Sequence, residues 1–196
     1  MDETLTINVT ECISRHRLAA SDQPSLQCGM PSRSRRDKVT TDFISPPFIL
    51  PESIIPNMCV NSKKQVFQVL ARKAANLTGR HEHTILSVLL ERERLGTTSI
   101  GNGVAIPHGK LPDMERVHGV FARLQRPIDF DAIDGQPVGL VFLLLAPDAG
   151  GVDNLRMLAR VSRLLHDRNM RDKLLGSDTA GAVYAILTEA GINREI

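Results

Sequence analysis

One histidine of this 196-residue chain, His108, stands in a segment whose residue types suit chemistry, SIGNGVAIPHGK at residues 99–110. Pro107 fixes its own backbone φ and favours extended backbone at Ile106, and Gly109 allows the chain to turn away directly after the histidine. We therefore expect His108 at a sheet edge, on rigid backbone and partly open to solvent. An imidazole with the ordinary pKa of about 6.5 is largely neutral, and so nucleophilic, at neutral pH.

Groups that can hold an anion lie close to His108 in the sequence. Backbone N–H groups of a glycine-rich turn, hydroxyl groups and cationic side chains all bind phosphoryl oxygens. The chain has all three kinds near this histidine: Gly101, Asn102 and Gly103, the hydroxyls of Thr97 and Thr98, and the cations Arg92 and Lys110. A nucleophilic imidazole among such donors is what a histidine phosphocarrier requires. A hydrogen-bonded structural histidine is the simpler alternative from these properties alone.

Other candidate sites are weaker. His81 and His83 form an H-x-H pair, but no third metal ligand follows at a suitable spacing. Asp129, Asp131 and Asp134 lack the glycine and the terminal glutamate of a calcium loop, so we interpret them as turn residues. We expect neither a metal nor a cofactor.

The composition argues against several classes of function. A net charge of +2, one tyrosine and no tryptophan leave little for nucleic-acid binding. The longest apolar run, Val138–Ala146, has nine residues, and a membrane-spanning helix needs about 20. Three widely spaced cysteines and the absence of an apolar leader indicate a cytoplasmic protein of a reducing compartment.

Apolar periodicity and capping residues predict the elements that must position His108. Helices are predicted at 63–77 after the cap Ser62 and before Gly79, at 82–95, from the cap Asp153 to about 165, at 170–175 and at 179–190. Strands are predicted at 54–60, 104–106, 116–124, near 128–130 and at 138–145, the last apolar on both faces and therefore central. This order predicts an α/β fold, a three-layer sandwich with a mixed sheet of about five strands flanked by helices.

Two parts of the chain differ in composition. Residues 1–45 are rich in Ser, Pro and Arg without sustained periodicity, so we expect a disordered tail, or a start site placed too early with Met30 as the true initiator. Residues 46–192 are expected to form one domain.

The segment RERLGTTSIGNGVAIPHGKLPD resembles the IIA components of the phosphoenolpyruvate:sugar phosphotransferase system (PTS), the type-2 EIIA domains of the fructose–mannitol class and their nitrogen-regulatory branch. The later segment PIDFDAIDGQPVGLVFLLLAP matches the same family, and the resemblance runs from about Ile54 to Leu187. The family fold, a mixed sheet between helices, agrees with the predicted order of elements.

The resemblance implies a nitrogen-regulatory phosphocarrier rather than an enzyme that turns over a substrate. In the family, the histidine of this motif, here His108, accepts a phosphoryl group on its Nε2 (tele) nitrogen from the phosphohistidine of a small HPr-like carrier. The phosphorylation state would then regulate target proteins such as sensor kinases, potassium transporters or metabolic enzymes. Residues expected to support the phosphate are Arg92, Thr98, Gly101, Asn102, Gly103 and Asn154.

One position departs from the family pattern. Many members carry a second histidine that faces the phosphorylated one, and here Asn154 stands in its place. An amide can hydrogen-bond a phosphate but cannot carry positive charge. We expect Asn154 to be an adequate polar partner, with weakened phosphoryl transfer as the alternative. Two other functions remain open: a IIA component of a fructose/mannitol-type sugar uptake system, and a regulatory binding module that is not phosphorylated.

Overall fold

The computed structural model describes residues 47–149 and 151–193, so the predicted tail at residues 1–45 lies outside the described residues. The helices are a short 3₁₀ turn at Pro51–Ser53, α1 (Lys63–Thr78), α2 (Glu82–Arg94), α3 (Gly151–His166), α4 (Arg168–Leu175) and α5 (Ala180–Glu189). The strands are β1 (Ile54–Met58), β2 (Ser99–Gly101), β3 (Val104–Ala105), β4 (His108–Leu111), β5 (His118–Ile128) and β6 (Val138–Pro147).

The six strands form one mixed sheet around β6. The strand order is β1-β5-β6-β3-β2, and β4 also pairs with β6. Strand β6 runs antiparallel to β5 but parallel to β3 and β4, and β1 runs parallel to β5. The prediction of a central strand at 138–145 is confirmed, because β6 is hydrogen-bonded on both sides.

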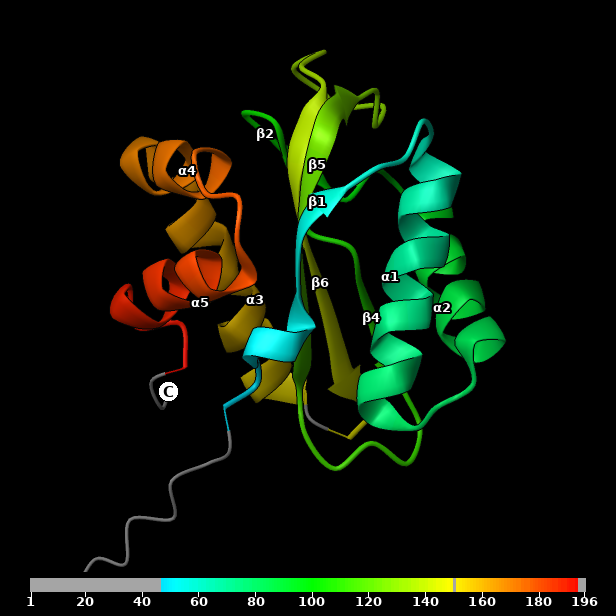
Figure 1. Cartoon of the computed structure of the whole chain (residues 1–196). Coiled ribbons are helices and arrows are strands. Elements are labelled where there is room, and N and C mark those ends of the chain that lie inside the picture. The colour runs from blue at the N-terminus through cyan, green and yellow to red at the C-terminus, as the bar shows by residue number, and fades with distance from the viewer. Residues whose placement is uncertain (1–46, 150, 194–196) are drawn as a thin grey trace, which may run out of the picture. The chain divides into compact units, whose positions relative to one another are not determined.

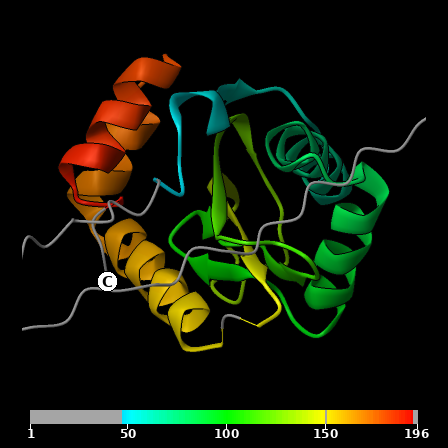
Figure 2. The same cartoon turned by 90° about the horizontal axis from the view of Figure 1, so that it is seen from below.

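Helices cover both faces of this sheet (Figures 1 and 2). Alternate residues of β6 point to opposite faces, as the two-residue repeat of a strand requires. Leu143 and Leu145 lie in the apolar cluster beneath α1 and α2. Phe142 and Leu144 lie in the cluster beneath α3, α4 and α5. The three-layer α/β architecture predicted from the sequence is therefore the observed one.

Capping residues set the ends of the first helix as predicted. The Ser62 hydroxyl accepts a hydrogen bond from the Gln65 N–H, which satisfies a backbone donor that the helix leaves free. Gly79 ends α1 in the left-handed conformation with φ 69°.

The sheet has one strand more than the predicted number, about five. The chain does not turn away at Gly109, because β4 begins at His108 and continues along β6 to Leu111 opposite Pro147. Strand β3 pairs with β6 only at Leu140 and Val141. The later backbone groups of β6 still need partners, and β4 supplies them.

Two further boundaries differ from the prediction. Strand β5 runs unbroken to Ile128, so the separate strand expected near 128–130 is its irregular end beside β6. Helix α3 begins at Gly151, so Asp153 lies in its first turn rather than at the cap. A carboxylate in the first turn still interacts favourably with the positive end of the helix dipole.

Candidate functional site

His108 is the first residue of β4, and its backbone lies opposite Leu144 of β6. It is partly exposed, as expected for a residue at the exit of a buried segment. Within the described strands β4 pairs only with β6, and it also contacts α2. Rigid backbone therefore holds the imidazole between the central strand and the end of a helix.

The two ring nitrogens of His108 have different partners. Nδ1 lies 2.9 Å from the carbonyl oxygen of Ile106, and the Arg92 Nε–H donates to Nε2 over 3.0 Å. A carbonyl oxygen can only accept, so Nδ1 carries the proton and Nε2 holds the lone pair. This is the neutral tautomer whose nucleophilic atom is Nε2.

Burial favours this neutral form. It lowers the pKa of His108 and is the largest influence on it, while the bond to Ile106 raises the pKa. The positive charge of Arg92 lowers the pKa further, and the negative charge of Glu93 raises it. The net pKa lies below the ordinary value of 6.5, so the ring is uncharged at neutral pH.

His108 opens into a cleft of ≈ 1020 Å³ between α2, β4, the end of β6 and the start of α3, here called the His108 cleft. Most of its walls are apolar, and Leu95 and Leu155 project from them with 86% and 69% of their surface exposed. Its charged side chains are Glu91, Arg92, Arg94 and Lys110. The cleft therefore combines a nucleophilic nitrogen with a cationic excess and apolar walls.

Asn154 lines the same cleft. Its Nδ2 donates to the carbonyl oxygen of Pro147 over 2.9 Å, which joins the start of α3 to the end of β6. Arg92 and Asn154, which the sequence predicts as phosphate-supporting residues, therefore both line the cleft that holds His108.

The glycine-rich turn does not reach this cleft. Gly101, Asn102 and Gly103 all have positive φ, of 83°, 54° and 75°, and form the tight turn between β2 and β3. Val104, next in the chain, lies opposite Leu140, and His108 lies opposite Leu144, so about 13 Å of strand separates them.

The turn does bind an anion, but one from the protein itself. The Asn102 N–H donates to the Asp134 carboxylate over 2.7 Å. This bond is the main reason why the pKa of Asp134 is lowered. The anion-binding geometry expected from the glycines is present, and Asp134 occupies it.

The two threonines also point elsewhere. Thr98 is buried, and its hydroxyl donates to the Glu93 carboxylate over 2.6 Å. The Thr97 hydroxyl donates to the carbonyl oxygen of Phe130 over 2.9 Å. Neither residue lines the His108 cleft. Glu93 was not among the predicted site residues. The only feature of the sequence that could have indicated a role for Glu93 is its position directly after Arg92.

No membrane-spanning helix and no metal cluster is found in the described part of the chain. None of its helices is both long and apolar enough to cross a membrane. Among residues 47–149 and 151–193, no three His, Cys, Asp or Glu side chains come together as metal ligands. His81 and His83 are exposed at the start of α2.

Comparison with known proteins assigns the chain to a family. Residues 47–190 match the family "Phosphoenolpyruvate-dependent sugar phosphotransferase system, EIIA 2". The chain belongs to this family of type-2 EIIA domains, which confirms the resemblance seen in the sequence.

Individual relatives indicate a branch within the family, the nitrogen regulatory proteins. The nitrogen regulatory protein of Bradyrhizobium diazoefficiens is 58% identical over 139 residues, which cover 71% of this chain and 91% of that protein. The crystal structure of the nitrogen regulatory protein IIA-Ntr from Neisseria meningitidis aligns with a TM-score of 0.69 and 33% identity, over 71% of this chain and 96% of that one. The IIA mannitol structure from Escherichia coli, 19% identical with a TM-score of 0.59, covers 69% of this chain and 96% of its own and shares the fold.

Proposed function

We propose that this chain is a nitrogen-regulatory phosphocarrier of the PTS, which accepts a phosphoryl group on Nε2 of His108 from an HPr-like carrier. The observation that carries the proposal is the pair of bonds on the ring. Ile106 holds the proton on Nδ1, and this leaves the Nε2 lone pair beside the Arg92 guanidinium. The names of the relatives support the regulatory assignment.

The transfer needs no external acid or base. The Nε2 lone pair of His108 attacks phosphorus, a P–N bond forms, and the P–N bond to the donor imidazole breaks with its electron pair returning to the donor nitrogen. The proton on Nδ1 stays in its bond to Ile106 throughout. Arg92 must release Nε2 as the phosphoryl group arrives, and its guanidinium can then bond the phosphoryl oxygens.

Asn154 has a modest part in this proposal. Its amide is already joined to Pro147, and an amide carries no charge. The positive charge near the phosphoryl group therefore comes from Arg92, with Lys110 and Arg94 elsewhere on the cleft.

Phosphorylation would change what the cleft can bind. A phosphoryl group adds about two negative charges, and here they would enter an apolar cleft with exposed Leu95 and Leu155. A target that packs on the apolar walls of the free form would meet a charged surface on the phosphorylated form. This difference is the physical basis of a regulatory output through sensor kinases, potassium transporters or metabolic enzymes.

The test is phosphorylation of the purified full chain with phosphoenolpyruvate, the first enzyme of the system and its HPr-like carrier. We expect one acid-labile, base-stable phosphoryl group on the wild type and none on His108→Ala. Asp153→Asn is the matched control, because this exposed carboxylate lies next to Asn154 but does not line the cleft. Undiminished labelling of His108→Ala would overturn the assignment of the site.

The same assay separates the alternatives. Onward transfer to a sugar-specific IIB protein, with formation of a sugar phosphate, would identify a sugar-uptake component. Absence of labelling in the wild type, with target binding retained, would identify a binding module that is not phosphorylated.

A further inference from the structure

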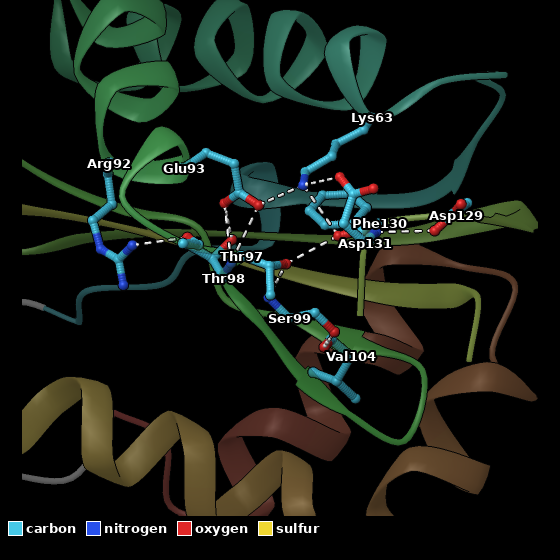
Figure 3. Close-up of polar contacts among 11 residues, drawn as sticks. Lys63, Arg92, Glu93, Thr97, Thr98, Ser99, Val104, Asp129, Phe130 and Asp131 are labelled. Carbon is cyan, nitrogen blue, oxygen red and sulfur yellow. Dashed lines mark hydrogen bonds and ion pairs between the residues drawn. The ribbon is translucent and has the colours of Figure 1, made fainter. Parts of the chain in front are cut away.

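A buried carboxylate lies one residue after Arg92. The Glu93 side chain is only 8% exposed and forms an ion pair with Lys63 Nζ at 2.7 Å. Thr98 donates to the same carboxylate through its hydroxyl, at 2.6 Å, and through its backbone N–H, at 3.1 and 3.2 Å. Figure 3 shows these bonds converging on Glu93 from α1 on one side and the start of β2 on the other.

Lys63 is itself held in place. Its Nζ donates to the carbonyl oxygen of Phe130 at 3.1 Å and lies 5.0 Å from the centre of the Phe130 ring. Burial lowers the pKa of Lys63, but the bonds to Glu93 and Asp131 outweigh burial and leave the pKa above its ordinary value. The ammonium group is therefore charged at any physiological pH, and the Glu93 carboxylate has a fixed partner.

These contacts hold residues 93–98, the segment that contains the Gly96 carbonyl oxygen bound by Arg92. The Arg92 guanidinium donates through Nη1 to the carbonyl oxygen of Gly96 at 3.1 Å and through Nε to His108. Gly96 lies between Glu93 and Thr98, the two residues that bond to each other. Successive helix residues point about 100° apart, so Arg92 reaches the cleft while Glu93 points inside.

We propose that Glu93, held by Lys63 and Thr98, is a positioning residue that places the Arg92 guanidinium against Nε2 of His108. The three residues are called the Glu93 clamp. This inference rests on the proposed function, because it assigns a role within phosphoryl transfer to His108. It also gives Thr98 a role: its hydroxyl bonds Glu93 rather than the phosphoryl group.

Energetics favour positioning over simple stabilisation. Desolvation offsets most of the attraction in a buried ion pair, so such a pair adds little net free energy of unfolding. The Glu93 clamp instead fixes the end of α2 relative to the start of α1 and to Thr98, directly before β2, with charge-assisted bonds whose geometry is strict. A small displacement of a catalytic group can lower the reaction rate strongly. Because Arg92 directly precedes Glu93, movement of the clamp would displace Arg92.

The test uses Glu93→Gln in the full chain, with potassium phosphoramidate as the phosphoryl donor. Nε2 attacks phosphorus, the P–N bond of phosphoramidate breaks and ammonia leaves, so the assay needs no partner protein. We expect Glu93→Gln to accept the phosphoryl group about tenfold more slowly than the wild type. The matched control is Asp131→Asn, which removes a 79% exposed carboxylate from the same lysine but leaves α2 untouched. This control should keep the wild-type rate.

Two readouts distinguish positioning of Arg92 from a general loss of stability. Hydrogen exchange of the Arg92 Nε–H, followed by NMR, should be faster in Glu93→Gln than in Asp131→Asn. In an Arg92→Gln background, Glu93→Gln should slow the reaction no further, because the group that it positions is already gone. A full additional loss in the double variant would overturn the inference.

If Glu93→Gln does not fold, Thr98→Val tests the clamp in its place, because this substitution deletes only the hydroxyl bond to Glu93. A slower reaction and faster Arg92 Nε–H exchange support the clamp, and wild-type values for both contradict it. The proposed function fails separately: labelling of His108→Ala would refute the site itself. A wild-type rate in Glu93→Gln, with His108→Ala unlabelled, would refute only the clamp.

Discussion

At His108, one backbone carbonyl decides which nitrogen can react. Ile106 lies two residues before the histidine, and its carbonyl oxygen accepts a hydrogen bond from the Nδ1–H. Pro107 stands between them and restricts the backbone, so the ring and its acceptor keep a fixed relation. Arg92 then meets Nε2 from α2. The ring therefore has one partner close in the sequence, Ile106, and one distant in the sequence, Arg92.

The lowered pKa of His108 predicts how the rate of phosphoryl transfer to this residue falls at low pH. Labelling by phosphoramidate should be constant near neutral pH and fall as Nε2 becomes protonated, with a midpoint below the ordinary histidine value of 6.5. Arg92→Gln should raise this midpoint, because the positive charge of Arg92 lowers the pKa. An NMR titration of the ring measures both. A midpoint above that of a histidine in an unstructured peptide would contradict this prediction.

The same shift affects stability, and its sign is clear. As the pH falls, the unfolded chain protonates this histidine before the folded chain does, because the folded pKa is the lower of the two. The free energy of unfolding contributed by His108 is therefore complete above the unfolded pKa. It is lost progressively as the pH falls to the folded pKa.

At the scale of elements, α2 lies against β4 because Gly109 has no side chain. A Cβ added at Gly109 would lie 2.6 Å from Cγ1 of Val88 on α2, closer than atoms can approach. The sequence suggested that this glycine permits a turn, but β4 continues through it. Its structural role is to admit the helix that carries Arg92 and Glu93.

Gly109→Ala should therefore displace α2 and disturb the site. We expect a loss of about 1–3 kcal/mol in the free energy of unfolding, typical of overpacking, together with slower labelling of His108. The double variant Val88→Ala/Gly109→Ala should recover much of the labelling rate, because it removes the methyl group that the new Cβ meets. Denaturant unfolding and phosphoramidate labelling measure the two effects. No recovery in the double variant would show that the contact with Val88 is not the cause.

At the scale of the molecule, β6 joins the two halves of the core. Its alternate side chains contribute to the apolar clusters on both faces of the sheet. The buried residues of both clusters lie between Phe48 and Ile192. The residues that line the His108 cleft lie between Val88 and Leu158. Within the described part of the chain, the core and the site thus belong to one unit.

Removal of residues 1–45 should leave both stability and labelling unchanged, because this segment is rich in Ser, Pro and Arg without sustained periodicity and the family match begins at residue 47. Thermal unfolding and phosphoramidate labelling of the shortened chain, beside the full chain, measure this. A lower unfolding temperature or a slower reaction would show that the domain needs residues before position 46.

The sequence alone determined the features that depend on neighbours along the chain. Ser62 and Gly79 set the ends of α1 by local bonding and backbone conformation, and the uninterrupted apolar run at 138–145 marked the central strand. The partly exposed position of His108 agrees with the local backbone restrictions of Pro107, but the turn expected at Gly109 is not formed. The motif around it was sufficient to indicate the family.

Tertiary structure decided which groups meet across the chain. Arg92 and Asn154 reach the cleft of His108, whereas the glycine turn binds Asp134 and Thr98 binds Glu93. A donor-rich residue type shows that a bond will form but not with which acceptor, because a buried polar group takes whichever partner the packed elements bring near. Strand pairing and helix packing make that choice, and they are absent from any local stretch of sequence.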